Sequence, residues 1–188
     1  PIITFVNKMD REARDTFEIL EEVQEKLALD TVPMTWPIGQ GKSFCGTYHL
    51  KDSAVRYGDS QKELTKVNGP EVVSEKLPEH ERQDWAEMAE LAIDGYPAFD
   101  RQAFLEGHMT PVYFGSALRN NGVRDLIHAL SDFAPAPRAQ VADVRTVEAT
   151  DPKMSAFVFK IQANMDPNHR DRIAFVRVCS GTLTRGMK

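Results

Sequence analysis

The stretch that decides the fold is FVNKMDR, residues 5–11. It ends the short apolar, β-branched run of residues 2–6, which is typical of a strand buried in a parallel sheet. Just beyond it, Asp15 with Glu18 three residues later predicts a helix N-cap, and apolar residues then recur at helical spacing. The polar residues 7–10 therefore lie between the carboxyl end of a strand and a helix, which is where ligands bind in open α/β sheets.

A second apolar run, residues 110–114, ends in the same way. The small and polar residues GSAL, 115–118, follow it, and Gly122 then precedes an amphipathic helix that extends to Phe133. The repeated order of buried strand, polar loop and helix predicts an α/β fold with both loops at one edge of a parallel sheet.

Changes of character along the chain predict its domain organisation. Prolines and glycines interrupt short β-like runs at about 31–76, which predicts a small β insertion within an α/β domain of residues 1–137. The proline-rich segment APAPR, 134–138, and the polar stretch to Lys153 predict a linker at 138–153. Apolar and polar residues then alternate in 154–188, as expected at the start of a truncated all-β barrel. Neither end of the chain resembles a natural terminus, so we expect an internal part of a longer protein.

Composition narrows the class of protein. The 188 residues are 41% hydrophobic and 27% charged, which is the balance of a soluble globular protein. The net charge of −5 argues against a surface that is basic overall and binds nucleic acid. No apolar run approaches the ~20 residues of a membrane span. Cys45 and Cys179 lie far apart, form no metal-binding pattern with the histidines, and are expected to be buried in a reducing, cytoplasmic compartment.

The pattern N-K-x-D predicts recognition of guanine. Guanine presents two adjacent N–H donors, and the two oxygens of the Asp10 carboxylate can accept both, whereas adenine offers no such pair. Asn7 is expected to bond another edge of the base and to join neighbouring loops, while the aliphatic stem of Lys8 covers a flat base or sugar face. At 115–118, small residues let a backbone N–H approach the oxygen of the base. The alternative is that both segments are ordinary strand-to-helix turns.

The segment GQGKS, 39–43, resembles the tail of a phosphate-binding loop, G-x-x-x-x-G-K-[ST]. The first glycine of that motif would fall at Trp36, and no helix pattern follows Ser43. Without a helix N-terminus the phosphate cradle cannot form, so we expect Lys42 to be a solvated loop lysine.

A small basic cluster, HRDR, occupies residues 169–172. It is interpreted either as an exposed hairpin or as a contact with RNA phosphate through Arg170 and Arg172, which would be a ribosome contact.

Taken together, these residues resemble a known family. NKMD and GSAL are similar to the fourth and fifth sequence motifs of translational GTPases, and the order of GTPase domain, proline-rich linker and β-barrel resembles the elongation factor G group. Within that group, TWPIGQGKSFCGTYHL (35–50) and FVFKIQANMDPNHRDRIAFVRVCSGTLTRGM (157–187) most resemble the bacterial peptide chain release factor 3 family. The likeness covers essentially the whole chain.

The resemblance implies a function and a set of ligands. It implies a cytoplasmic, ribosome-dependent GTPase that helps class I release factors dissociate after termination, and that binds GTP or GDP with Mg²⁺. It implies no catalytic residue and no metal ligand in this chain, because the hydrolytic half of the site precedes it in the family, so the chain alone is expected not to hydrolyse GTP. The implied guanine-binding residues are Asn7, Lys8, Asp10, Ser116, Ala117 and Leu118.

Alternatives from other classes stay open. The chain could belong to another translational GTPase, such as elongation factor G or a tetracycline ribosomal-protection protein. It could also be a ribosome-binding module that binds no nucleotide of its own.

Overall fold

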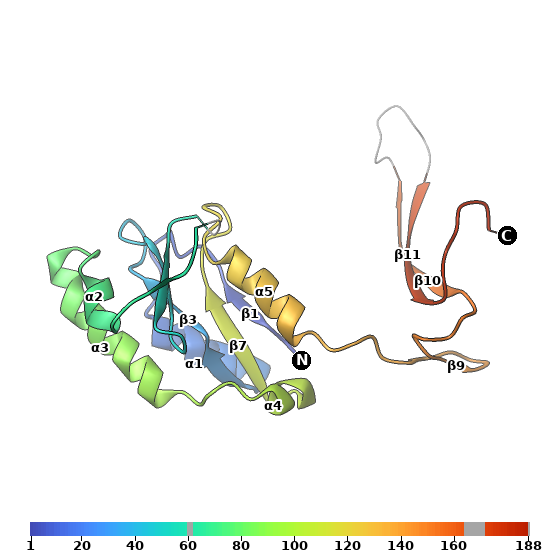
Figure 1. The fold of residues 1–188 in the computed structure, drawn as a ribbon, viewed down its shortest axis with the longest axis horizontal. Coiled ribbons are helices and arrows are strands. Elements are labelled where there is room, and N and C mark those ends of the chain that lie inside the picture. The colour runs from blue at the N-terminus through green and yellow to red at the C-terminus, as the bar shows by residue number, and fades with distance from the viewer. Residues whose placement is uncertain (60–61, 164–171, 188) are drawn as a thin grey trace. The chain divides into compact units, whose positions relative to one another are not determined.

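The computed structural model describes residues 1–59, 62–163 and 172–187 and divides the chain into two compact units, Pro1–Ala134 and Pro135–Lys188 (Figure 1). The first unit contains β1 (Thr4–Val6), α1 (Thr16–Leu27), β2 (Asp30–Pro33), β3 (Thr35–Ile38), β4 (Gly46–His49), β5 (Ala54–Tyr57), β6 (Thr65–Lys66), α2 (Pro70–Ser74), α3 (Glu79–Gly95), α4 (Arg101–Glu106), β7 (Met109–Phe114) and α5 (Val123–Phe133). The second unit contains β8 (Gln140–Val141), β9 (Thr146–Val147), β10 (Ser155–Ala163) and β11 (Arg172–Ser180).

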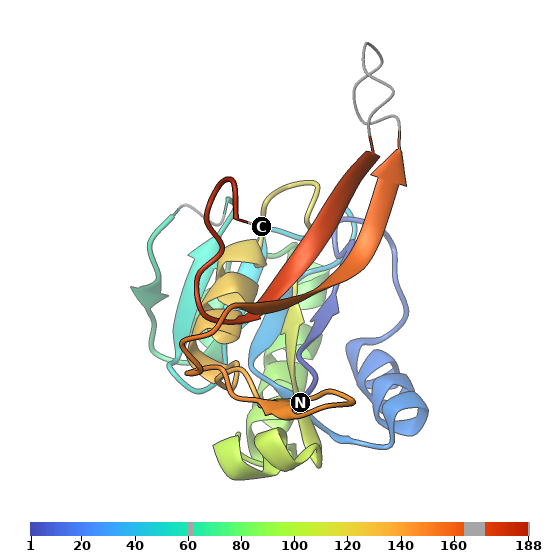
Figure 2. The same cartoon turned by 90° about the vertical axis from the view of Figure 1, so that its right-hand side faces the viewer.

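A parallel sheet in the order β1–β7–β2 carries the first unit. In its register Val6 lies opposite Phe114, so β1 and β7 end side by side. All six residues of β7 are buried, which explains its continuous apolar sequence. Helices α3 and α5 lie on opposite sides of the strands (Figure 1, Figure 2).

The four-stranded antiparallel sheet β3–β4–β5–β6 packs into the same core. One buried cluster joins Trp36 of β3 and Tyr48 of β4 to Trp85 of α3 and Phe114 of β7. The indole Nε1–H of Trp85 donates to the Pro37 carbonyl at 2.6 Å, which fixes α3 against β3. The antiparallel sheet therefore shares the hydrophobic core of the first unit.

The structure differs from the sequence expectation at the start of the predicted insertion, 31–76. Residues 30–33 form β2, which pairs in parallel with β7, and the antiparallel sheet begins only at Thr35. In the sequence, Pro33 was interpreted as part of a turn. In the structure β2 is an edge strand of the described sheet, and a proline, which lacks a backbone N–H, is tolerated in an edge strand. The five-residue helix α2 also falls within the predicted range.

Helix boundaries follow local chemistry. The carboxylate of Asp15 accepts the backbone N–H of Phe17 at 2.8 Å and of Glu18 at 3.4 Å, so the predicted N-cap of α1 is confirmed. Gly122 adopts a φ of 75° as it leads into α5. Its added Cβ would approach the Phe114 carbonyl oxygen to 2.4 Å, so only glycine fits there.

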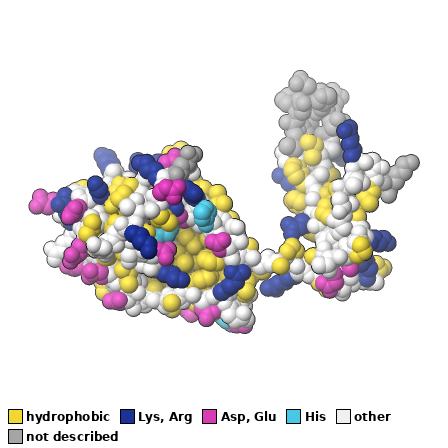
Figure 3. Space-filling view, in the orientation of Figure 1, with side chains coloured by type: hydrophobic (Ala, Val, Ile, Leu, Met, Phe, Trp, Pro, Cys, Tyr) yellow, Lys and Arg dark blue, Asp and Glu magenta, His cyan; other side chains and the backbone are white. Residues whose placement is uncertain are grey.

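The second unit is built on the antiparallel pair β10–β11. Phe157, Phe159 and Ile161 are half or more exposed on β10, at 50%, 62% and 66%. Figure 3 shows hydrophobic side chains on the visible faces of both units, with basic and acidic side chains among them. The predicted fold class, an α/β domain followed by a β domain, is confirmed.

Candidate functional site

Two loops leave neighbouring parallel strands at the same edge of the sheet. Residues 7–10 follow β1 and residues 115–118 follow β7, at the upper end of the first unit in Figure 1. The ladder continues past the strands, because the amide of Gly115 donates to the Val6 carbonyl and the amide of Met9 donates to the Gly115 carbonyl, both at 3.0 Å. The two loops therefore form one surface.

The side chain of Asn7 joins the two loops directly. Its Oδ1 accepts the backbone N–H of Lys8 at 2.8 Å and the backbone N–H of Ala117 at 2.9 Å. Lys8 is exposed and has a φ of 69°, a left-handed conformation that is uncommon for a residue with a side chain. Such strain is often found where a ligand site requires a particular loop shape.

Asp10 lies beside Ser116 in the opposite loop. Its side chain is only 9% exposed, and its Oδ2 lies 4.0 Å from Nε of Arg119. The side-chain hydrogen bond with Ser116 lowers the pKa of Asp10 below its ordinary value, an effect that partial burial opposes and that Arg119 reinforces. The carboxylate is therefore charged at neutral pH and offers acceptor oxygens to a donor pair.

Solvent exposure increases along residues 116–118. Ser116 is buried and its Oγ accepts the Arg119 N–H at 3.3 Å, whereas Leu118 is 84% exposed. The sequence predicted that a backbone N–H here faces the base oxygen. The Ala117 amide donates to Asn7 Oδ1 at 2.9 Å, so this one of the backbone N–H groups in the loop is paired within the protein.

Sequence reasoning missed Asn121 and Arg119, and it named Gly115 without its steric role in the second loop. Asn121 and Ser116 exchange two backbone hydrogen bonds, both of 2.9 Å, which close the loop. Gly115 has no room for a side chain, since a Cβ would meet the Asn121 carbonyl oxygen at 2.3 Å. Arg119 places its guanidinium near Asp10. The dipeptide Asn-Gly at 121–122 was the available signal, because it is typical of tight turns.

The GQGKS segment forms the connection between β3 and β4. Backbone and side-chain hydrogen bonds between Ser43 and Gln40 close it into a turn, and a strand rather than a helix follows. It has no helix N-terminus that could hold phosphate, as the sequence predicted.

The predicted basic cluster is only partly described. Arg172 begins β11 and is exposed, whereas Arg170 lies outside the described residues. Among the described residues, no group of three or more His, Cys, Asp or Glu side chains is placed to hold a metal ion. No helix in the described part of the chain combines the length and the apolar character needed to cross a membrane.

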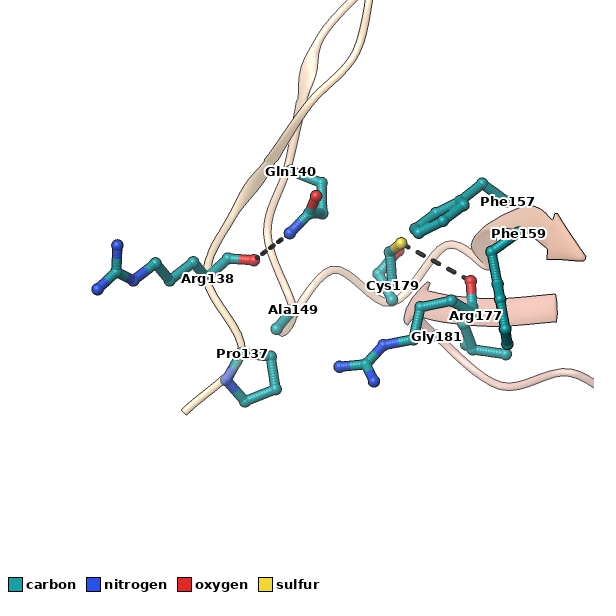
Figure 4. Close-up of a pocket in the computed structure, with 11 residues that line it drawn as sticks. Pro137, Arg138, Gln140, Ala149, Phe157, Phe159, Arg177, Cys179 and Gly181 are labelled. Atoms are coloured by element: carbon teal, nitrogen blue, oxygen red, sulfur yellow. Dashed lines mark hydrogen bonds between the residues drawn. The ribbon is translucent and has the colours of Figure 1, made fainter. Parts of the chain in front are cut away.

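A cavity of about 610 Å³ lies within the second unit. Figure 4 shows Phe157, Phe159 and Cys179 gathered on one side of it, with Pro137 and Ala149 on the other. None of the predicted guanine-site residues lines it. Its lining mixes apolar side chains with polar ones such as Arg138 and Arg177, and it brings together none of the sequence-predicted site residues, so the two loops remain the candidate site.

Comparison with known proteins identifies the family. Residues 1–136 match the elongation factor Tu GTP binding domain, and residues 153–188 match elongation factor G domain 2. The chain belongs to the translational GTPases. A crystal structure of a protein from Thermus thermophilus shares the fold, with a TM-score of 0.63 and 20% sequence identity over 100% of this chain. The chain spans 28% of the length of that protein.

Because the chain belongs to the translational GTPases, the ligand to consider at the two loops is a guanine nucleotide. The partly buried Asp10 presents charged carboxylate oxygens, which are acceptors of the kind that the two adjacent N–H donors of guanine require.

Proposed function

We propose that Asn7, Lys8, Asp10 and residues 116–118 bind the guanine base of GTP or GDP in a ribosome-associated GTPase of translation. The observation that carries this proposal is the hydrogen bond from the Ala117 amide to Asn7 Oδ1, beside the ionised Asp10. That bond ties two segments 110 residues apart into a single rim. A rigid rim holds the Asp10 oxygens where they accept both guanine donors at once.

Each residue has a separate part in base recognition. Asp10 selects guanine because its charged oxygens accept two donors that adenine lacks. The exposed Lys8 lays its methylene groups along the base or the ribose while its ammonium group stays in water. Asn7 holds the 116–118 loop at the distance that the base requires. Hydrolysis of GTP, and the Mg²⁺ that it needs, are the work of residues outside this chain in the intact protein.

Within the translational GTPases we favour a termination factor of the cytoplasm that acts on the ribosome and releases class I release factors. The support is the sequence of residues 35–50 and 157–187, which resembles bacterial release factor 3. Elongation factor G and tetracycline ribosomal-protection proteins are the competing members, since elongation factor G domain 2 matches residues 153–188. Assays with the intact protein separate them: a termination factor releases class I release factors from terminated ribosomes, and elongation factor G drives translocation.

Substitution of Asp10 by Asn in the intact protein tests the guanine site. An amide presents one acceptor in place of two, so GTP affinity should fall about 10- to 100-fold. Xanthosine triphosphate exchanges one base donor for an acceptor, so its affinity should rise. The measurement is titration of a fluorescent analogue of each nucleotide.

Asp94→Asn is the matched control, because Asp94 is exposed on α3 and distant in sequence from both loops. Unchanged GTP affinity in Asp10→Asn would remove Asp10 from the site. A protein that binds ribosomes but no guanine nucleotide would favour the ribosome-binding module instead.

A further inference from the structure

One end of the antiparallel sheet lies against both loops of the guanine site. The strand register puts Ile38, Gly46 and Tyr57 side by side at that end. The chain segments that continue from it, 39–45 and 58–59, reach the two loops through separate contacts. They lie at the same upper end of the first unit in Figure 1 as the loops themselves.

The first contact supports the loop that contains Asp10. The backbone N–H of Gly41 donates to the carbonyl of Met9 at 2.9 Å, and the Met9 side chain is buried. Gly41 belongs to the GQGKS turn, which internal hydrogen bonds make stiff. At Gly39 in the same turn, φ is +73° and a Cβ would lie 2.6 Å from the Ser43 carbonyl oxygen. The turn therefore holds the backbone of Met9, the residue before Asp10, in a fixed position through the Gly41 hydrogen bond.

A second set of contacts supports the loop that contains Ala117. The side-chain amide of Asn121 donates to the Gly58 carbonyl, and that of Asn120 donates to Oδ1 of Asp59 at 2.8 Å. Asn121 is 3% exposed and also closes the loop through its backbone. The Phe44 carbonyl accepts a longer bond, 3.5 Å, from Arg119.

A buried ion pair fixes the sheet to the helix that follows the second loop. Nη2 of Arg56 on β5 lies 3.0 Å from Oδ1 of Asp125, and both side chains are about 5% exposed or less. Nε2 of His49 on β4 lies 3.4 Å from the other Asp125 oxygen. Burial alone would raise the pKa of Asp125, but His49 and Arg56 together hold it below its ordinary value. A buried pair tolerates little change in geometry, because separating it leaves an uncompensated charge.

We propose that the end of the antiparallel sheet positions the two guanine-recognition loops, with Asn121 and Asp59 as its positioning residues. The inference rests on the proposed guanine site. Neither residue touches the base. Each acts by keeping the 116–121 loop in register with the Asp10 loop, so that both guanine donors meet the carboxylate together. Loss of either contact should lower the discrimination between bases as well as the affinity.

The test compares GDP with inosine diphosphate in the intact protein. Inosine lacks the 2-amino group, so the ratio of the two affinities measures how well Asp10 meets both guanine donors. In Asn121→Ala, GDP affinity should fall about 2- to 12-fold, the value of one neutral hydrogen bond, and the affinity ratio should fall with it. Asn68→Ala is the matched control, because Asn68 is an exposed asparagine that follows β6.

Asp59 gives a second variant that leaves the loop sequence intact. Asp59 is exposed, so Asp59→Ala should fold even if Asn121→Ala does not. Asp59→Ala should lower the affinity ratio, and Asp59→Asn, which keeps an oxygen acceptor for Asn120, should restore it. A purely structural role would change the unfolding temperature but not the ratio.

The outcomes separate this inference from the proposed function. If the unsubstituted protein does not distinguish GDP from inosine diphosphate, the guanine site itself is wrong and the inference falls with it. If the unsubstituted protein distinguishes them and the Asp59→Ala ratio is unchanged, the guanine site stands and the positioning role is overturned.

Discussion

Asp10, which we propose binds guanine, shows how neighbouring groups set the charge of a side chain. An isolated carboxylate at the end of a strand would be hydrated and would have its ordinary pKa of 3.8. Here the Ser116 hydrogen bond comes from a segment more than 100 residues away, and Arg119 adds a positive charge. Both favour the ionised form, so the acceptor needed for guanine is present wherever the protein is folded near neutral pH.

Removal of the Ser116 hydroxyl should change the titration of Asp10. The folded pKa is depressed, so the charged form, and the stability that it contributes, is present above 3.8 and is lost as pH falls through the lower folded value. In Ser116→Ala the pKa should rise toward 3.8, and GDP binding should be lost at a higher pH than in the unsubstituted protein. The measurement is the NMR titration of the Asp10 carboxyl carbon. Ser131→Ala, at an exposed position of α5, is the control, and identical Asp10 titrations in all three proteins would contradict the prediction.

Sequence reasoning reaches some of these residues and not others, for physical reasons. Asn7 and Asp10 are predictable because parallel strands deliver their carboxyl ends to one edge of the sheet. The contact of Asn121 with Gly58 joins residues 63 apart and depends on how the inserted sheet packs. No local pattern encodes that packing. The bond from the Ala117 amide to Asn7 Oδ1 joins residues 110 apart and likewise could not be predicted from a local pattern.

At the scale of elements, the junction between β7 and α5 is packed without spare volume. Gly115 contacts the loop closure at Asn121 and the ring of Phe5, and Gly122 contacts the last residue of β7. These contacts let the loop double back directly beside β1.

At the start of the inserted sheet, the sequence pattern was misleading. Pro33 looks like a turn in sequence, whereas in the structure it ends an edge strand that pairs in parallel with β7.

A methyl group at Gly115 should destabilise this junction. Its Cβ would lie 2.3 Å from the Asn121 carbonyl oxygen and 2.9 Å from the Phe5 ring, so backbone must shift at a cost of about 1–3 kcal/mol. Gly95→Ala is the control, because nothing lies within 4 Å of its added Cβ and it ends α3, where alanine should be neutral or stabilise by up to ~1 kcal/mol. Tryptophan fluorescence during thermal unfolding reports on this unit, since both tryptophans, Trp36 and Trp85, lie in its core. Equal unfolding temperatures for the two variants would contradict the steric argument.

At the scale of the whole molecule, the distribution of charged side chains bears on how the protein could bind RNA. The net charge of −5 gives no general attraction to RNA. The second unit nevertheless carries the exposed Arg172 and Arg177 on β11, in a region that matches elongation factor G domain 2. A small number of local phosphate contacts, and not a basic coat, is the mode of RNA binding consistent with this distribution.

Replacement of Arg170 and Arg172 by alanine in the intact protein should weaken its association with ribosomes. Each arginine that contacts phosphate releases counterions on binding, at about 0.7 per contact for single-stranded nucleic acid, so the loss should be larger at low salt and the salt slope shallower. Arg185→Ala removes an equivalent exposed charge outside β10 and β11 and is the control. The measurement is co-sedimentation with ribosomes across a salt series. Salt restricts the effect of exposed charges to about 10 Å at 0.1 M, so a loss that is the same at every salt concentration would indicate altered packing of β11 and would rule out phosphate contact by these arginines.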